Sequence, residues 1–171
     1  LSDHIKHIWD RIDVLINNAG ITEEKLLIKM EEEDFLRVLG VNLKGAFFIT
    51  KELLPLMIKH GGHIIYISSI SALKGQIGLA SYSASKAGLI GVMRSLSREL
   101  APYNIRVNAI LPGYMMTDMG CGASEIAKHR ALEESLLRRY TDPEEVADFI
   151  EYLINTKGVT GQVFNIDSRI I

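Results

Sequence analysis

Short apolar runs alternate with segments of helical period along almost the whole chain. The apolar runs cover residues 12–20, 63–71, 105–113 and 158–167, and the helical segments cover residues 31–60, 81–103 and 142–154. Strands that are apolar through their middle and alternate with helices form a parallel sheet that is covered on both faces. The sequence therefore predicts an α/β fold built on a doubly wound parallel sheet.

Two further segments have less regular patterns. Residues 2–11 have the spacing expected at the end of an amphipathic helix. Residues 114–140 show no clean period before a helical stretch at 129–139, and Thr141 or Asp142 is expected to cap the helix that follows. A length of 171 residues suits one domain, so residues 1–171 are expected to form a single unit.

Composition argues against several classes of function. A net charge of −2 and a pI of about 6.2 do not favour nucleic acid or an anionic membrane as a partner. No apolar run reaches the length of a membrane span. The single cysteine, Cys121, cannot form an internal disulfide, which indicates a reducing, cytoplasmic setting. His4 and His7 lie one helical turn apart without a third ligand, so no metal site is expected.

The stretch SYSASKAG places Tyr82 and Lys86 four residues apart, on one face of a helix. A tyrosine ordinarily ionises near pH 10, and a nearby ammonium favours the phenolate, so we expect Lys86 to lower the pKa of Tyr82. Such a phenol can exchange a proton with an alcohol or a developing alkoxide. The alternative is a chance pair, because tyrosine and lysine at this spacing occur on many surface helices.

Polar or glycine-containing turns follow three successive predicted strands. Asn17 to Gly20 follow the first, Ser69 ends the second, and Pro112 and Gly113 end the third. The carboxyl ends of parallel strands meet at one edge of a sheet, where open α/β folds bind ligands. These turns, together with Tyr82 and Lys86, predict a binding crevice at that edge.

Five motifs in chain order resemble those of the short-chain dehydrogenase/reductase family. They are Asn17-Asn18-Ala19-Gly20, Asn42 within VNLKGAF, Ser69 within ISS, Tyr82-Ser83-Ala84-Ser85-Lys86, and LPGYMMTDM with Pro112, Gly113 and Thr117. The resemblance covers nearly the whole chain and implies a Rossmann-type doubly wound parallel sheet.

The resemblance also implies roles for most of these residues. It implies that Tyr82 is the general acid/base, that Lys86 hydrogen-bonds the nicotinamide ribose, that Ser69 holds the substrate oxygen, and that Asn42 helps to position a water for proton relay. The implied cofactor-binding residues are Asn17, Ala19 and Gly20 on the adenosine side, Tyr82 and Lys86, and Pro112, Gly113, Met115 and Thr117 at the nicotinamide.

Within the family, the sequence looks most like the 3-oxoacyl-(acyl-carrier-protein) reductases. That likeness implies reduction of a 3-oxoacyl thioester in fatty-acid synthesis, NADPH as cofactor with NAD as the alternative, and a homotetramer. Two departures bear on this: Tyr103 stands where bacterial examples often carry an arginine for the carrier protein, and FNIDSRII stands where Asp-Gly-Gly is common. The alternatives are another alcohol or carbonyl substrate, such as a sugar, steroid or small hydroxy acid, and a non-catalytic remnant.

One family feature has no counterpart in the sequence. The family begins with a strand, a glycine-rich turn and a helix whose N-terminus holds the pyrophosphate, and no Gly-x-x-x-Gly-x-Gly occurs in these residues. The run at 12–20 matches the fourth strand of the family. We therefore expect the N-terminal strands to be absent from this chain, which corresponds to two βαβ units of roughly sixty to seventy residues.

Overall fold

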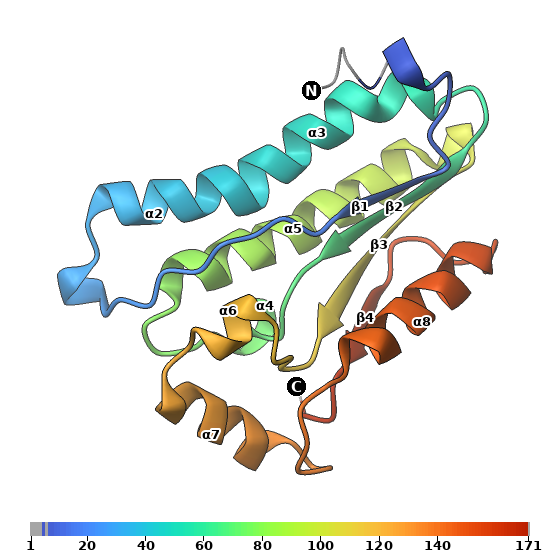
Figure 1. The fold of residues 1–171 in the computed structure, drawn as a ribbon. Helices are drawn as coiled ribbons and strands as arrows, with labels where there is room; N and C mark the ends of the chain where they lie inside the picture. Colours follow the sequence, from blue (N-terminus) through green and yellow to red (C-terminus); the bar gives the residue numbers. More distant parts are fainter. Residues whose placement is uncertain (1–4, 6, 171) are drawn as a thin grey trace.

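A parallel sheet lies at the centre of the computed structural model, which describes residue 5 and residues 7–170 (Figure 1). Its four strands follow one another in the order β1-β2-β3-β4. Their bounds are Val14–Asn17 for β1, Gly62–Ile67 for β2, Ile105–Pro112 for β3 and Val163–Ile166 for β4. All neighbouring strands pair in parallel, so their carboxyl ends share one edge of the sheet. The α/β class predicted from the sequence is confirmed.

Helices cover both faces of the sheet, as the apolar strands require. The long helix α5 (Ala80–Glu99) lies on one face beside α2 (Glu32–Leu39) and α3 (Ala46–Leu53), and α8 (Pro143–Asn155) lies on the other (Figure 1). Alternate residues of one strand serve the two layers. Ile64 and Tyr66 of β2 belong to the core under α5, and Ile65 between them belongs to the core under α8.

The segment predicted as one helix over 31–60 is interrupted. A capping box between Glu31 and Asp34 begins α2, and a π-helical turn, η2 (Gly40–Gly45), separates α2 from α3. A short 3-10 turn, η3 (Leu54–Leu56), follows α3 because Pro55 cannot continue the α-helical hydrogen bonding. The chain then turns at Gly61, whose φ of +73° favours glycine and where a Cβ would lie 2.7 Å from the carbonyl oxygen of Asn104.

The segment after β3 forms two helices, and the predicted bounds there were wrong. The structure has α6 (Asp118–Cys121) and α7 (Glu125–Glu134), rather than a helix over 129–139. Ser124 caps α7 by accepting a hydrogen bond from the backbone of Ala127 at 3.3 Å, which sets its start four residues early. Asp142 caps α8 as predicted, accepting from the backbone of Glu144 at 3.0 Å.

The remaining elements are short. They are η1 (Leu27–Lys29), α4 (Ser71–Lys74) and η4 (Ala101–Tyr103). The helix expected over residues 2–11 lies partly outside the described residues, since residues 1–4 and 6 are not described; Trp9 donates a backbone hydrogen bond to Ile5 at 2.9 Å, which closes one turn there. Over the described part of the chain, no helix combines the length and the apolar character needed to cross a membrane.

Candidate active site

The carboxyl end of β2 leads directly into the segment that carries the predicted catalytic residues. Ser69 lies two residues beyond β2, and α4 begins two residues later. The chain returns through Gly75 and Gly78, both at positive φ, and enters α5, whose first two turns carry Tyr82 and Lys86. A strand end, a short loop and a helix start therefore bring Ser69 and Tyr82 together, and their side chains share a hydrogen bond.

Lys86 is buried beside the Tyr82 ring. Its side chain is held in place by a hydrogen bond from Nζ to the carbonyl oxygen of Ile67 at 2.7 Å, and Nζ lies 5.6 Å from the centroid of the Tyr82 ring. Burial penalises the ammonium and lowers the pKa of Lys86 from 10.5 to about 8. An ammonium has three N–H donors, so two of them are left for other acceptors at this point.

The pKa of Tyr82 moves in the opposite direction to the sequence-based expectation. Burial of the phenol raises this pKa above its ordinary value, and the hydrogen bond with Ser69 only partly opposes that effect. The expectation that Lys86 lowers the pKa of Tyr82 is wrong for this structure. The reason is geometric: the lysine side chain faces the tyrosine ring and directs its hydrogen bond to the backbone of β2 rather than to the phenol oxygen.

Asn42 lies in the π-helical turn and is fully buried. Its Oδ1 accepts a hydrogen bond from the backbone N–H of Ile21 at 2.8 Å, and its Nδ2 donates to the carbonyl oxygen of Ile21 at 2.9 Å. Nδ2 also donates to Ser85 Oγ at 3.0 Å. Asn42 thus fixes the loop after β1 to the helix that carries Tyr82 and Lys86.

The end of β1 and the loop that follows it contain three further predicted residues, and the structure separates them. Gly20 lies closest to the centre of the site, since a Cβ there would be 3.4 Å from both Asn42 Oδ1 and Lys86 Nζ. Ala19 is exposed. Asn17, the last residue of β1, donates from Nδ2 to Thr50 Oγ1 at 3.1 Å, so its amide is directed toward α3.

The predicted residues after β3 occupy three different environments. Pro112 and Gly113 are buried, and Gly113 packs so closely that a Cβ would lie 1.9 Å from Thr141 Oγ1. Met115 packs among the apolar side chains under α8. Thr117 is exposed at the start of α6. In the part of the chain that the structure describes, no hydrogen bond joins Met115 or Thr117 to Ser69, Tyr82 or Lys86.

Two serines to which the sequence analysis assigns no role, Ser68 and Ser85, also contribute to the site. Ser68 donates from Oγ to the carbonyl oxygen of Lys86 at 2.8 Å and so attaches α5 to the end of β2. Ser85 accepts from Asn42 and donates to the carbonyl oxygen of Tyr82 at 2.7 Å. The sequence carries a signal for Ser68: residues adjacent along an extended chain point to opposite sides, so Ser68 faces away from the side that Ser69 faces.

The described residues contain no group of three or more His, Cys, Asp or Glu side chains arranged to hold a metal ion. His4 lies outside the described residues. Cys121 is a free, exposed thiol in α6.

Comparison with known proteins agrees with this geometry. Residues 1–168 match the family model described as enoyl-(acyl carrier protein) reductase. The chain is 46% identical over 166 residues to the 3-oxoacyl-(acyl-carrier-protein) reductase FabG of Thermotoga maritima, covering 95% of this chain and 68% of that protein. It is 43% identical over 168 residues to the protein of the same name from Aquifex aeolicus, covering 96% of this chain and 68% of that protein.

A relative of a different name matches at similar identity. The chain is 42% identical over 156 residues to carbonyl reductase family member 4 of Danio rerio, covering 91% of this chain and 65% of that protein. Together with the parallel sheet and the Ser69, Tyr82 and Lys86 cluster, these matches lead to one conclusion: the chain belongs to the short-chain dehydrogenase/reductase family of NAD(P)-dependent oxidoreductases.

Proposed function

We propose that this protein reduces the ketone of a 3-oxoacyl thioester, carried on acyl carrier protein, with NADPH in fatty-acid synthesis. The observation that carries the proposal is the contact of Tyr82 with both Ser69, through a hydrogen bond, and Lys86, at 5.6 Å from its ring centroid. The substrate is taken from the names of the relatives that are 43–46% identical.

The residues around Lys86 fit the nicotinamide ribose of such a cofactor. One of the three N–H donors of Lys86 goes to Ile67, which leaves two for a pair of ribose hydroxyls. Gly20 presents no side chain over Nζ, so a flat ligand can approach it. We assign Lys86 to this end of the cofactor, and also Gly20, which the resemblance places on the adenosine side, because it lies against Lys86 Nζ. The further proposed cofactor residues are Asn17, Ala19, Tyr82, Pro112, Gly113, Met115 and Thr117.

The proposed proton donor is the phenol of Tyr82. NADPH, when bound, supplies the hydride for the carbonyl carbon. As negative charge develops on the carbonyl oxygen, Tyr82 transfers its phenolic proton to that oxygen, and the hydroxyl of Ser69 donates a hydrogen bond to it. The raised pKa of Tyr82 suits this direction, because it keeps the phenol protonated near neutral pH.

Asn42 takes a positioning role in this proposal. Both protons of its amide are already donated, to Ile21 and to Ser85. A water that relays protons to Lys86 would therefore meet an oxygen of Asn42 rather than its Nδ2. The side chain holds the loop that contains Gly20 against the helix that contains Lys86.

The proposed assembly is a homotetramer in the cytoplasm, with an acyl-carrier protein as the substrate-bearing partner. Large apolar side chains are exposed on α2, η2 and α3, namely Leu36, Val41, Phe47 and Phe48, and a second copy of the chain would cover them. Lys59, Arg94 and Arg98 are exposed cations that suit an acidic carrier.

A second candidate is reduction of another carbonyl compound, and the relative named carbonyl reductase family member 4 favours it. The third reading, a non-catalytic remnant, requires that the chain bind no dinucleotide.

The deciding experiment measures NADPH oxidation at matched concentrations of acetoacetyl-acyl-carrier protein and of carbonyl substrates without a thioester, with NADH as the cofactor control. We expect the highest kcat/KM for the thioester with NADPH. Equal or higher kcat/KM for a sugar, steroid or hydroxy-acid ketone would establish the second candidate instead. Absence of both turnover and dinucleotide binding by calorimetry would establish the remnant.

A further inference from the structure

A cavity of about 190 Å³ opens immediately beside the proposed catalytic serine. Three segments that are far apart in sequence enclose it: the start and end of α4 with the loop that follows, the last turns of α7, and the segment after β4. Ile70 and Ser71 begin its wall one residue beyond Ser69. Ser71 also donates its backbone N–H to Ser69 Oγ at 3.2 Å, so one wall of the cavity fixes the serine hydroxyl.

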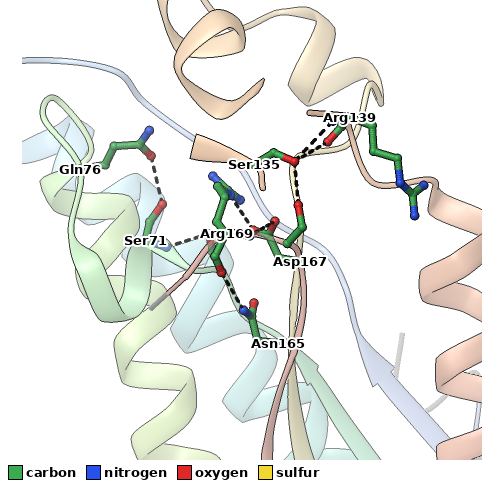
Figure 2. A network of polar contacts seen from close by, with 9 residues as sticks. Ser71, Gln76, Ser135, Arg139, Asn165, Asp167 and Arg169 are labelled. Atoms are coloured by element: carbon green, nitrogen blue, oxygen red, sulfur yellow. Dashed lines mark hydrogen bonds and ion pairs between the residues drawn. The ribbon is translucent and has the colours of Figure 1, made fainter. Parts of the chain in front are cut away.

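Arg169 forms the opposite wall and is unusually well held for a residue so near the end of the described chain. Its side chain is 8% exposed, and its Nε donates a hydrogen bond to Asp167 Oδ2 at 2.5 Å. The side chain of Asp167 is itself only 4% exposed. The backbone N–H of Arg169 donates to Asp167 Oδ1 at 3.1 Å, and its carbonyl oxygen accepts from Asn165 at 3.4 Å. Figure 2 shows the guanidinium between the loop of Ser71 and the segment of Ser135.

The segment that carries Arg169 is also attached to the end of α7. Ser135 Oγ and Ser168 Oγ share a hydrogen bond of 2.6 Å, and the backbone N–H of Leu136 donates to the carbonyl oxygen of Ser168 at 3.3 Å. Since α7 supplies Arg130 and Glu134 to the same cavity, these contacts set the spacing between the two arginines.

The cavity presents more positive charge than its carboxylates can neutralise. Lys74, Arg130 and Arg169 line it together with one acid, Glu134. Asp167 occupies only Nε of Arg169, and the two terminal nitrogens of that guanidinium have no hydrogen-bond partner among the described residues. Within the same part of the chain, Lys74 and Arg130 form no ion pair. The terminal nitrogens of Arg169 and the guanidinium of Arg130 therefore remain available in this cavity, and guanidinium groups are suited to bind anionic oxygens.

We propose that this cavity binds an anionic oxygen group, a carboxylate or a phosphate, of the ketone substrate, with Arg169 and Arg130 as its ligands. The inference rests on the proposed reductase function and adds a substrate class to it. A substrate whose ketone lies at Ser69 extends past Ile70 into this space, where the guanidinium groups discriminate between a charged and an uncharged end. Gln76, whose Oε1 accepts from Ser71 Oγ at 3.1 Å, keeps the adjoining wall in place.

Calorimetric titration with succinate and with inorganic phosphate tests the site without turnover. We expect the protein to bind at least one of them, and Arg130→Gln to weaken that binding about tenfold, as loss of a charged hydrogen bond does. Arg130 is chosen because it makes no hydrogen bond or ion pair among the described residues, so its replacement breaks no polar contact there. Lys157→Gln is the matched control, since it removes one exposed positive charge beyond the end of α8.

The two probes separate the two sources of the charge. Binding of succinate alone assigns the site to a substrate with a carboxylate end, and binding of phosphate alone assigns it to a phosphate on the substrate's carrier arm. Failure of both anions to bind, or equal binding by the protein and Arg130→Gln, would overturn the proposal.

Turnover then distinguishes this proposal from the reductase function itself. The substrates are two 3-oxoacyl thioesters of N-acetylcysteamine, one ending in a methyl group and one in a carboxylate. We expect Arg130→Gln to lower the ratio of kcat/KM for the charged thioester to kcat/KM for the neutral thioester about tenfold. Arg169→Lys keeps a positive charge beside Asp167, and we expect it to lower the same ratio by less. An unchanged ratio in Arg130→Gln contradicts the cavity assignment, whereas no turnover of either thioester contradicts the reductase function.

Discussion

The ammonium of Lys86 lies 5.6 Å from the centroid of the Tyr82 ring while it donates a hydrogen bond to the carbonyl oxygen of Ile67. The end of β2 therefore determines where the lysine stands, and the lysine faces the ring of the tyrosine. This arrangement leaves the phenol oxygen to Ser69. Lys86 and Tyr82 consequently have different hydrogen-bond partners, so the contribution of each residue to activity and stability can be measured separately.

Replacing Tyr82 by phenylalanine removes the proposed proton donor and leaves the ring against Lys86. We expect kcat/KM for ketone reduction to fall by about a thousandfold, within the range of general acid catalysis, with an unchanged circular dichroism spectrum. Tyr152→Phe on α8 removes a phenolic hydroxyl from a side chain that is 68% exposed and serves as control. Retention of more than a tenth of the activity in Tyr82→Phe would mean that another group delivers the proton.

The lowered pKa of Lys86 predicts a specific dependence of stability on alkaline pH. In the folded protein the ammonium loses its proton near pH 8, and in the unfolded chain near its ordinary pKa of 10.5. Between these values the unfolded chain binds more protons, so this group makes the folded state more stable as pH rises. Lys86→Met abolishes the contribution. In urea titrations, we expect the free energy of unfolding of the protein, relative to that of Lys86→Met, to increase from pH 7.5 to pH 10. If the two free energies change with pH in parallel, Lys86 does not contribute to this pH dependence.

Asn42→Ala removes three hydrogen bonds from a buried position and leaves the backbone groups of Ile21 without partners. At about 1 kcal/mol for each bond, the free energy of unfolding should fall by about 3 kcal/mol. Hydrogen exchange at the amide of Ile21 should accelerate at the same time. Asn155→Ala is the matched change at the exposed end of α8, where one hydrogen bond to Glu151 is lost, and we expect it to cost less than about 1 kcal/mol. Equal losses for the two variants would contradict the inference that Asn42 holds the loop after β1 against α5.

His63 should make the protein sensitive to mild acid. The ring is fully buried in β2, and burial, followed by the charge of Arg106, lowers its pKa from 6.5 to about 4. Between these pH values the unfolded chain binds the proton and the folded protein does not, so stability falls as pH decreases from about 6.5 to 4.

His63→Gln removes this dependence, and His129→Gln, at an exposed position on α7, is the control that retains it. Thermal unfolding at pH 4.5 and pH 7 measures the difference. A pH dependence that persists unchanged in His63→Gln would assign it to other groups.

Sequence periodicity was sufficient for the arrangement of strands and helices but not for the interruptions of the helices. Each of the four apolar runs coincides with all or nearly all of one strand, because strands of a parallel sheet covered on both faces are apolar along most of their length. The π-helical turn at Gly40–Gly45 left no such signal, since VNLKGAF has ordinary helical character. The start of α7 depended on Ser124, a cap that the charged pattern of residues 129–139 obscured.

The site was predictable in composition and only partly in electrostatics. Ser69, Tyr82 and Lys86 lie together, because one strand end and one helix start position all three. The direction of the Tyr82 pKa was not predictable, since spacing along a helix gives no measure of how deeply a phenol is buried. In the sequence Arg169 is part of a segment, FNIDSRII, that departs from a common C-terminal pattern, and only the tertiary structure shows its burial against Asp167.

The π-helical turn η2 makes the length of this segment matter as much as its composition. Each residue of an α-helix adds about 100° of rotation, and the wider turn provides the phase at which Val38 of α2 and Leu53 of α3 are both buried. Deleting a single residue between positions 40 and 45 would rotate one half of the helix against the other by about that angle, turning Leu53 or Val38 toward solvent and Asn42 away from Ile21. The segment should therefore accept many substitutions at its exposed positions but no insertion or deletion.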